Sequence, residues 1–396
     1  MPAVLSRAPR GFHAILAHAF FMQTALAIVR PSASYRALEM EVGVALLGLV
    51  VASFSLLPVF LAVWVGRRLD AGHEAPVLLA GAACMLAAGA GLLWATPNLP
   101  MLLLWNAVLG LGHLGGILGE QAQLAAYDRA KLDRSFGLYT MVVAVGQALA
   151  PLFMGALGGG AVRPDTTLLL GTYLAGAVAV LAAAFAMLRG RPRTPRGVRP
   201  PAATLRAALA VPPRKRRVLT GAILFGMMVL CAMDLVQVYL PALAVERGIP
   251  VSVVGALLSL RAAATVVSRF GLDRLVSRFG RGRLLLVSSC GSAVLLGLLA
   301  VPMPAALLGA LMVAIGLVMG VGQPLGMTLV SLYAEPGTRG TWIGLRMTGN
   351  RLGQAVIPAA VGFFAGGLGA GGAFLCIGAA MGVAAAFSFG AFRSLE

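Results

Sequence analysis

Apolar residues along this chain fall into twelve continuous runs of about 20 residues, separated by short polar segments. A run of that length spans the roughly 30 Å hydrocarbon core of a bilayer when it folds as an α-helix. The expected helices cover residues 11–34, 41–65, 76–96, 100–126, 135–158, 167–188, 218–245, 250–271, 283–302, 304–333, 341–366 and 371–392. Because the runs are continuous rather than alternating, a transmembrane β-barrel is excluded. The pattern predicts an all-α membrane protein with twelve transmembrane helices.

Composition supports a membrane location. Hydrophobic residues make up 59% of the chain and charged residues only 11%, against about 25% charged residues in soluble domains. The four cysteines lie in four separate apolar runs without metal-ligand spacing, so they are expected to be small packing residues. No metal and no cofactor is expected.

The formal net charge of +18 would suggest a nucleic-acid partner in a soluble protein. With twelve spans, however, most of the 31 Lys and Arg fall at the two termini and in alternate loops, and the exceptions in loops on the opposite side are Arg30, Arg36, Arg163 and Arg247. This distribution obeys the positive-inside rule. It predicts a multi-pass protein of the cytoplasmic membrane with both termini in the cytoplasm, the lipid bilayer as partner and no nucleic acid.

A segment of the fifth run recurs in the eleventh run, 207 residues later. The two copies are Gly146-Gln-Ala-Leu-Ala-Pro151-Leu-Phe-Met-Gly155 and Gly353-Gln-Ala-Val-Ile-Pro358-Ala-Ala-Val-Gly362. The repeat predicts two similar six-helix halves, residues 1–188 and 218–396, joined by a basic, proline-rich cytoplasmic linker at 189–217. Paired halves in so apolar a chain are typical of carriers that work by alternating access. Gly146, Pro151, Gly353 and Pro358 are expected to be helix-packing residues.

Two basic loops carry a family resemblance. The loop after the eighth run reads Asp273-Arg-Leu-Val-Ser-Arg278-Phe-Gly280-Arg281-Gly-Arg, and the loop after the second run reads Gly66-Arg-Arg-Leu-Asp70-Ala-Gly-His-Glu. With the two-times-six layout, they resemble the signature loop of the major facilitator superfamily. The resemblance implies that fold over nearly the whole chain. It also implies a cytoplasmic gate formed by Asp70, Gly66, Arg278, Gly280 and Arg281, with Asp70 near the helix start at Thr341.

The fifth run is similar to that family's antiporter signature, Gly-x-x-x-Gly-Pro-x-x-Gly-Gly. Gly146, Pro151 and Gly155 match it, whereas Ala150 and Met154 depart from it. The resemblance favours efflux. In the fourth run, Asn106 stands where the family has a membrane-embedded arginine.

Ionisable residues inside the runs are few, and a charge at mid-bilayer costs about 2.5–3.5 kcal/mol even on the most lenient scale. Asp234 and Arg261 lie at equal distances from the turn near Arg247, so neighbouring antiparallel helices would place them at one depth. Two interpretations stay open. The pair is either a structural ion pair or a substrate or proton site whose pairing changes during the cycle.

The fourth run carries Asn106, His113, Glu120 and Tyr127 at intervals of seven residues, which places them on one helix face. This stripe is expected either to line a proton or substrate route or to hydrogen-bond neighbouring helices. In the second case Glu120 would form a gate salt bridge with Arg67 or Arg68.

Further polar residues extend the candidate pathway. Arg346 and Asn350 share one side of the eleventh helix, Gln23 lies on the first and Gln323 on the tenth. A cationic pocket at Arg346 would suit an anionic or carboxylate-bearing substrate. His18, near the start of the first helix, is expected at the membrane interface.

The leading functional hypothesis is a monomeric secondary transporter of a small organic compound, working by proton-coupled efflux. The alternative is proton-coupled uptake of an organic anion. An enzyme is not expected, because the loops hold no nucleophile–base pair or acidic metal cluster, and a P-loop for ATP is absent. At the 207-residue offset, His113 and Glu120 correspond to Gly320 and Met327, so the two halves differ where transport residues are expected.

Overall fold

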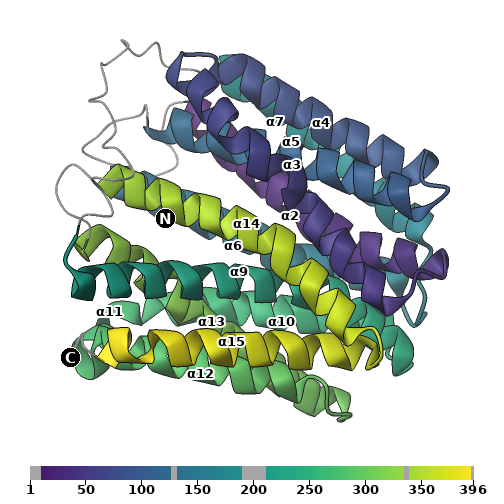
Figure 1. The fold of residues 1–396 in the computed structure, drawn as a ribbon. Coiled ribbons are helices and arrows are strands. Elements are labelled where there is room, and N and C mark those ends of the chain that lie inside the picture. Colours follow the sequence, from purple (N-terminus) through teal and green to yellow (C-terminus); the bar gives the residue numbers. More distant parts are fainter. Residues whose placement is uncertain (1–9, 126–131, 190–210, 334–338, 394–396) are drawn as a thin grey trace. The chain divides into compact units, whose positions relative to one another are not determined.

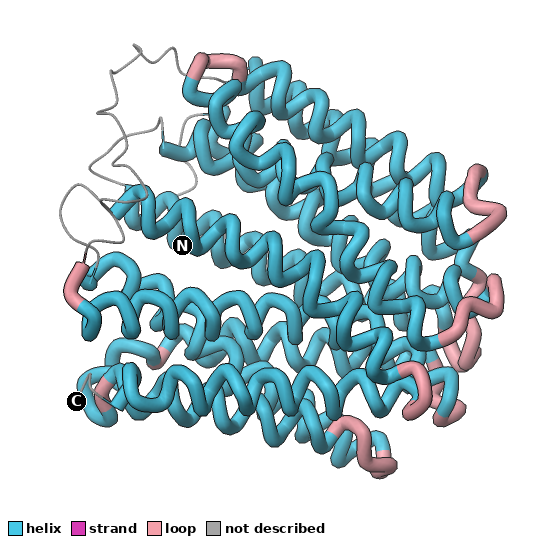
Figure 2. Tube along the Cα trace, viewed as in Figure 1, coloured by secondary structure: helices cyan, strands magenta, loops and turns pink. Residues whose placement is uncertain are grey.

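A computed structural model describes residues 10–125, 132–189, 211–333 and 339–393. These residues form helices joined by short connections, and no strand occurs among them (Figure 2). The helices are α2 (Arg10–Glu39), α3 (Val44–Asp70), α4 (Glu74–Trp94), α5 (Leu99–Ala125), α6 (Leu132–Gly158), α7 (Thr166–Arg189), α9 (Pro213–Glu246), α10 (Val251–Phe270), α11 (Leu272–Phe279), α12 (Arg281–Leu298), α13 (Ala305–Tyr333), α14 (Arg339–Ala365) and α15 (Gly369–Arg393).

The expected all-α fold is confirmed, and each of the twelve expected spans coincides with one long helix. Eleven of the described helices are long and apolar enough to cross a membrane. The remaining long helix, α14, is not among the eleven and carries Arg346 and Arg351 within its length. Because lipid offers no hydrogen-bond partners, a segment that crosses the membrane as a helix satisfies its backbone groups internally.

One element was not expected. Residues 272–279, interpreted from the sequence as a loop, form the short helix α11. Its apolar residues are Leu272, Leu275, Val276 and Phe279, at the spacing of one helix face. Gly280 ends α11 with a φ of 78°, a conformation that glycine adopts without a side-chain penalty.

The chain divides into two compact units, which are described separately. Unit 1 comprises residues 1–42, 53–198 and 249–259, and unit 2 comprises 43–52, 199–248 and 260–396. The first part of α3 thus belongs to unit 2, and the first part of α10 to unit 1. The helices are labelled in Figure 1.

The same helix pairings occur in both units. In unit 1, α2 packs on α5, α6 and α7, while α4 packs on α5 and α7. In unit 2, α9 packs on α13, α14 and α15, while α12 packs on α13 and α15. The internal sequence repeat is therefore a repeat of helix packing as well.

The repeated glycines lie at helix crossings. A Cβ atom at Gly146 of α6 would approach Phe20 and Thr24 of α2 to 3.0 Å. At Gly353 of α14, 207 residues later, it would meet Met227 of α9, also 207 residues after Phe20. Small residues permit this close approach of helix backbones.

A second pair of repeated contacts involves the prolines. In unit 2, a Cβ atom at Gly48 of α3 would collide with the carbonyl oxygen of Pro358 on α14. In unit 1, one at Gly255 of α10 would collide with the carbonyl oxygen of Pro151 on α6. Both members of each contact recur at the 207-residue offset, so one packing design is used twice.

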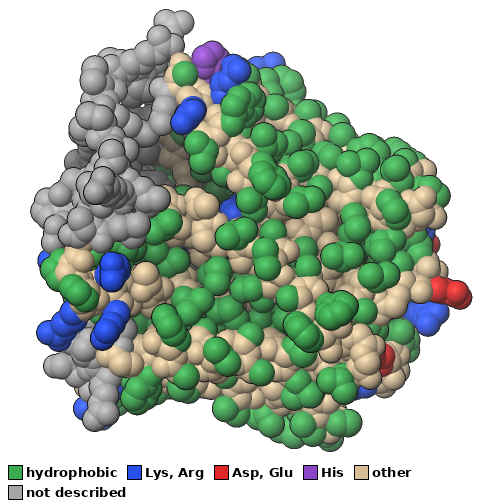
Figure 3. All heavy atoms as spheres, viewed as in Figure 1, with side chains coloured by type: hydrophobic (Ala, Val, Ile, Leu, Met, Phe, Trp, Pro, Cys, Tyr) green, Lys and Arg blue, Asp and Glu red, His purple; other side chains and the backbone are tan. Residues whose placement is uncertain are grey.

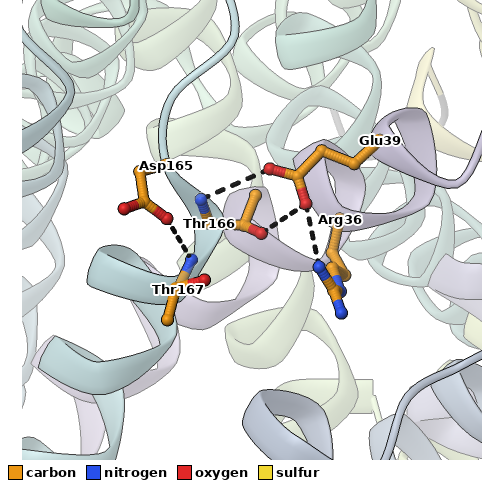
Figure 4. A network of polar contacts seen from close by, with 5 residues as sticks. All are labelled: Arg36, Glu39, Asp165, Thr166 and Thr167. Atoms are coloured by element: carbon orange, nitrogen blue, oxygen red, sulfur yellow. Dashed lines mark hydrogen bonds and ion pairs between the residues drawn. The ribbon is translucent and has the colours of Figure 1, made fainter.

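The end of α2 holds the start of α7 through a polar network, shown in Figure 4. Glu39 accepts hydrogen bonds from the backbone nitrogen and the hydroxyl of Thr166, at 3.4 and 2.5 Å, and pairs with Arg36 at 3.1 Å. Asp165 accepts a bond from the backbone nitrogen of Thr167 at 2.8 Å. Carboxylates thus satisfy the free N–H groups at the N-terminus of α7.

The outer surface is suited to lipid. On the face drawn in Figure 3, hydrophobic side chains are spread over the whole surface, and charged side chains lie mainly towards its edges. Large apolar side chains are widely exposed, including Phe60 at 72%, Phe363 at 79% and Phe387 at 74%. Such extensive apolar exposure would cause a soluble protein to aggregate.

Candidate functional site

In unit 1, three helices bring together a buried acid, an imidazole and a phenol. The Nδ1 atom of His18 on α2 lies 2.5 Å from one carboxyl oxygen of Glu120 on α5. The hydroxyl of Tyr139 on α6 donates a hydrogen bond to the other oxygen at 2.7 Å. His18 and Glu120 are completely buried, and Tyr139 is 5% exposed. These three residues are called the His–Glu–Tyr triad below.

A second polar group lies further along the same helices. The amide nitrogen of Gln23 on α2 lies 3.5 Å from Nε2 of His113 on α5, and its amide oxygen accepts a bond from Gln147 of α6 at 2.9 Å. Gln23 and His113 are buried. Gln23 therefore connects the three helices that also build the triad.

Beyond this group, α3 approaches α5. Asn106 donates a hydrogen bond to the hydroxyl of Ser53 at 2.9 Å. The guanidinium of Arg30 lies 4.6 Å from the ring centre of Phe54, and that ring lies 5.5 Å from the His113 ring. The ring quadrupole of Phe54 attracts the Arg30 cation. Asn106 and His113, both predicted from the sequence as pathway residues, therefore each have a neighbour on α3, Ser53 and Phe54 respectively.

The two interpretations of the stripe on α5 can be compared with this geometry. Asn106, His113 and Glu120 are all buried and bonded to neighbouring helices, whereas Tyr127 lies outside the described residues. The partners of Glu120 are His18 and Tyr139 rather than the exposed Arg67 or Arg68. His18, expected at the membrane interface, is completely buried within the protein.

Unit 2 holds the second buried acid. Asp234 of α9 accepts a hydrogen bond from the amide of Gln354 on α14 at 2.7 Å. Asp234 and Arg261 of α10 are both 7% exposed. The pairing expected for Asp234 and Arg261 stays a prediction. Gln354 belongs to the sequence repeat, but its bond to the acid was not foreseen.

Three buried polar atoms on α10 and α14 lack partners. Nε of Arg261, Nε of Arg346 and the amide oxygen of Asn350 are buried without a hydrogen-bond partner among the described residues. Arg346 and Asn350 are each 8% exposed and lie one turn apart on α14. An unsatisfied buried polar atom costs about 1–3 kcal/mol. Such guanidinium groups are suited to hold a carboxylate or another oxyanion.

The expected gate residues are only partly described. Arg278 and Arg281 are exposed on either side of Gly280, and the Arg278 guanidinium carbon lies 5.5 Å from the ring centre of Phe279. Nothing approaches a Cβ atom placed at Gly66. The side chains of Asp70 and Thr341 lie outside the described part of the structure, so the cytoplasmic gate remains a prediction. The side chain of Gln323, expected in the substrate pathway, also lies outside it.

No group of three His, Cys, Asp or Glu able to hold a metal ion occurs among the described residues. Two residues of the triad, His18 and Tyr139, were missed as functional candidates. No sequence signal pointed to either one, because neither shares a helix with Glu120 and each meets it only through packing.

A profile of the Major Facilitator Superfamily matches residues 15–240 and 223–394. No curated protein sequence matches the chain.

Solved structures share the fold at low sequence identity. The nucleoside transporter NupG superposes with a TM-score of 0.73 at 14% identity, covering 98% of this chain and 100% of its own. The inward-open xylose transporter XylE from E. coli has a TM-score of 0.72 at 15% identity, covering 96% and 94%. A bacterial homologue of the human lysosomal transporter Spinster, inward-facing and unoccupied, has a TM-score of 0.68 at 15% identity, with 97% of both chains covered.

Both halves of the sequence thus match one family of membrane transporters, and the fold agrees over almost the entire length. Membrane transport is the corresponding class of activity. The chain belongs to the major facilitator superfamily.

Proposed function

We propose that the protein is a secondary active transporter that exports a small organic compound from the cytoplasm in exchange for protons. The two repeated halves, residues 1–188 and 218–396, would rock about a central substrate site while the linker at 189–217 tethers them. Such a carrier would act as a monomer in the cytoplasmic membrane, with both termini in the cytoplasm.

The observation that carries this proposal is the burial of ionisable groups within membrane-spanning helices. Glu120 and Asp234 are 0% and 7% exposed, although a charged group inside a bilayer is expensive. Each has polar partners on other helices, so each can hold or exchange a proton or bind a cationic group. Buried acids of this kind typically mark ion or substrate pathways in transporters.

Efflux is favoured by the partial antiporter signature on α6, Gly146, Pro151 and Gly155. The alternative, uptake of an organic anion, rests on the unpaired guanidinium atoms of Arg261 and Arg346. Both directions use the same protein groups. They differ in which side loads the substrate, which is a matter for a transport assay.

The test uses inverted membrane vesicles energised to hold a proton gradient. A panel of small organic acids, bases and neutral compounds is first screened by thermal shift with the purified protein, and the hits are radiolabelled. Accumulation that collapses when the gradient is dissipated supports export. Accumulation only in right-side-out vesicles rejects export and supports the uptake alternative.

A further inference from the structure

We propose that the His–Glu–Tyr triad of His18, Glu120 and Tyr139 is the site that binds and releases the coupling proton. This inference rests on the proton-coupled transport proposed above and names its site. The triad joins α2, α5 and α6 within unit 1, close to the ends of these helices that lie on the side of the N-terminus.

The hydrogen bonds define how one proton is gained. Before the coupling proton binds, a neutral His18 donates its Nδ1 hydrogen to the Glu120 carboxylate, and the triad carries one negative charge. A proton then binds at Nε2 of His18, while the Nδ1 proton moves to Glu120. The product is a neutral imidazole protonated at Nε2 and a neutral carboxylic acid, and release reverses both steps.

An unpaired atom marks where the proton enters. Nε2 of His18 is buried and has no hydrogen-bond partner among the described residues. A histidine that only stabilised the fold would be expected to satisfy both ring nitrogens, because an unsatisfied buried nitrogen is costly. An imidazole with one nitrogen on the acid and the other free is arranged to pass a proton through its ring.

The internal repeat provides a comparison inside the same molecule. Contacts show that α5 and α13 correspond at an offset of 206 rather than 207 residues. Gly116 lies against the ring of His18, and Gly322 lies against the ring of Phe225, which is 207 residues after His18. At this offset the counterpart of Glu120 is Gly326, not the Met327 expected from the sequence.

Unit 2 therefore builds the same helix crossing from Phe225 and Gly326. Phe225 is 1% exposed and packs edge-to-face on Phe392. Arg346 of α14, 207 residues after Tyr139, is buried beside Gly226 at the same crossing. Unit 2 thus forms this crossing without an acid or an imidazole, so packing does not require that pair. A costly pair that packing does not require is best explained by a role in transport.

Few other ionisable groups that could influence protonation of the triad are described on the neighbouring helices. The other ionisable groups described on α2, α5 and the helices packed against them are His13, Arg30, Tyr35, Arg36 and Glu39 on α2, Arg67 and Arg68 on α3, Glu74 and Cys84 on α4, His113 on α5, and Tyr173 and Arg189 on α7. Glu39 and Arg36 pair with each other at the opposite end of α2. Tyr173 donates its hydroxyl hydrogen to the backbone of Met85.

The triad also couples the proton to helix position. Tyr139 is the hydrogen-bond link from α6 to Glu120, and a charged carboxylate accepts a stronger hydrogen bond than a neutral acid. Uptake of the proton therefore weakens the bond between α5 and α6. The same α6 carries Gly146 and Pro151, which make the close helix contacts described above.

The test requires no substrate. Infrared difference spectra between low and high pH are recorded for the purified full chain in lipid nanodiscs. The wild type should show the C=O band of a carboxylic acid that appears reversibly at low pH, and Glu120→Gln should lose it. Tyr139→Phe and His18→Phe should each shift its frequency, because each removes one hydrogen bond from the carboxyl group.

Glu39→Gln is the matched control and should retain the band. The inference is overturned if folded Glu120→Gln keeps the band or if Glu39→Gln loses it. Thermal unfolding and gel filtration verify folding, and His18→Phe, which installs the residue found in unit 2, gives a second variant if Glu120→Gln does not fold.

Vesicle transport of the screened hits separates this inference from the proposed function. Gradient-driven transport in the wild type that persists with the same pH dependence in Glu120→Gln rejects the triad and leaves the proposed function intact. Transport by the wild type that ignores the proton gradient rejects the proposed coupling. Loss of gradient dependence in Glu120→Gln alone supports both.

Discussion

The contact between Gly48 of α3 and Pro358 of α14 offers a direct test of how glycine controls helix separation. Replacing Gly48 with Ala adds one methyl group that collides with the Pro358 carbonyl oxygen and lies 3.0 Å from Cα of Gly362. Both neighbours are backbone atoms, so no side-chain rotation relieves the clash. We expect the substitution to favour conformations in which α3 and α14 are further apart.

The magnitude follows from two opposing effects. Alanine gains about 1 kcal/mol over glycine in a helix interior, whereas overpacking costs about 1–3 kcal/mol. Gly171 of α7 is a matched control, because nothing lies within 4 Å of a Cβ atom placed there. Since the propensity gain cancels between the two variants, their difference is about 1–3 kcal/mol, which corresponds to a roughly 5–150-fold change in a conformational equilibrium.

The assay measures distances between spin labels at Leu46 of α3 and Phe363 of α14, which are 42% and 79% exposed. The four native cysteines are replaced first, since Cys290 is exposed. Gly48→Ala should increase the population at longer distance, and Gly171→Ala should leave it unchanged. An unchanged distribution in Gly48→Ala, or an equal change in both variants, would refute the reasoning.

Three further predictions concern stability, measured by unfolding in detergent. Glu39→Gln should destabilise the protein by about 0.5–2 kcal/mol, because the first turn of α7 loses its charged cap. Asp234→Asn tests the ion pair with Arg261 that the sequence predicts: a pair predicts a loss of about 3–5 kcal/mol, because Arg261 would be left as a buried charge, and adding Arg261→Met should recover part of that loss. Arg247→Ala should cost about 1.5–3 kcal/mol, because three carbonyl groups after α12 lose their hydrogen bonds to the guanidinium.

Exposed residues at comparable places serve as controls. Glu41→Gln and Arg163→Ala should change stability by less than about 0.5 kcal/mol. A loss as large as that of Glu39→Gln or Arg247→Ala would show that net charge, rather than the named bonds, is responsible. A double variant of Asp234 and Arg261 no more stable than Asp234→Asn would contradict the ion-pair argument.

Helix positions were predictable because the bilayer imposes a simple rule. Backbone groups in lipid must bond within the helix, so a long apolar run can form little else. The short helix α11 was not predicted in this way, because it lies outside the apolar runs and mixes apolar with charged residues. The site was predictable where polar residues repeat on one helix, as Asn106, His113 and Glu120 do on α5.

The sequence by itself determined the helices, the internal repeat and the few ionisable groups buried within spans. Only the tertiary structure decided which of them meet. His18 reaches Glu120 from 102 positions away, and Gln354 reaches Asp234 from 120. The tertiary structure also set the one-residue difference in register between the two halves, which makes Gly326 the equivalent of Glu120. Contacts between helices depend on rotation about each helix axis, and one residue turns a side chain by about 100°. Periodicity within a single helix carries no information about that rotation relative to its neighbours.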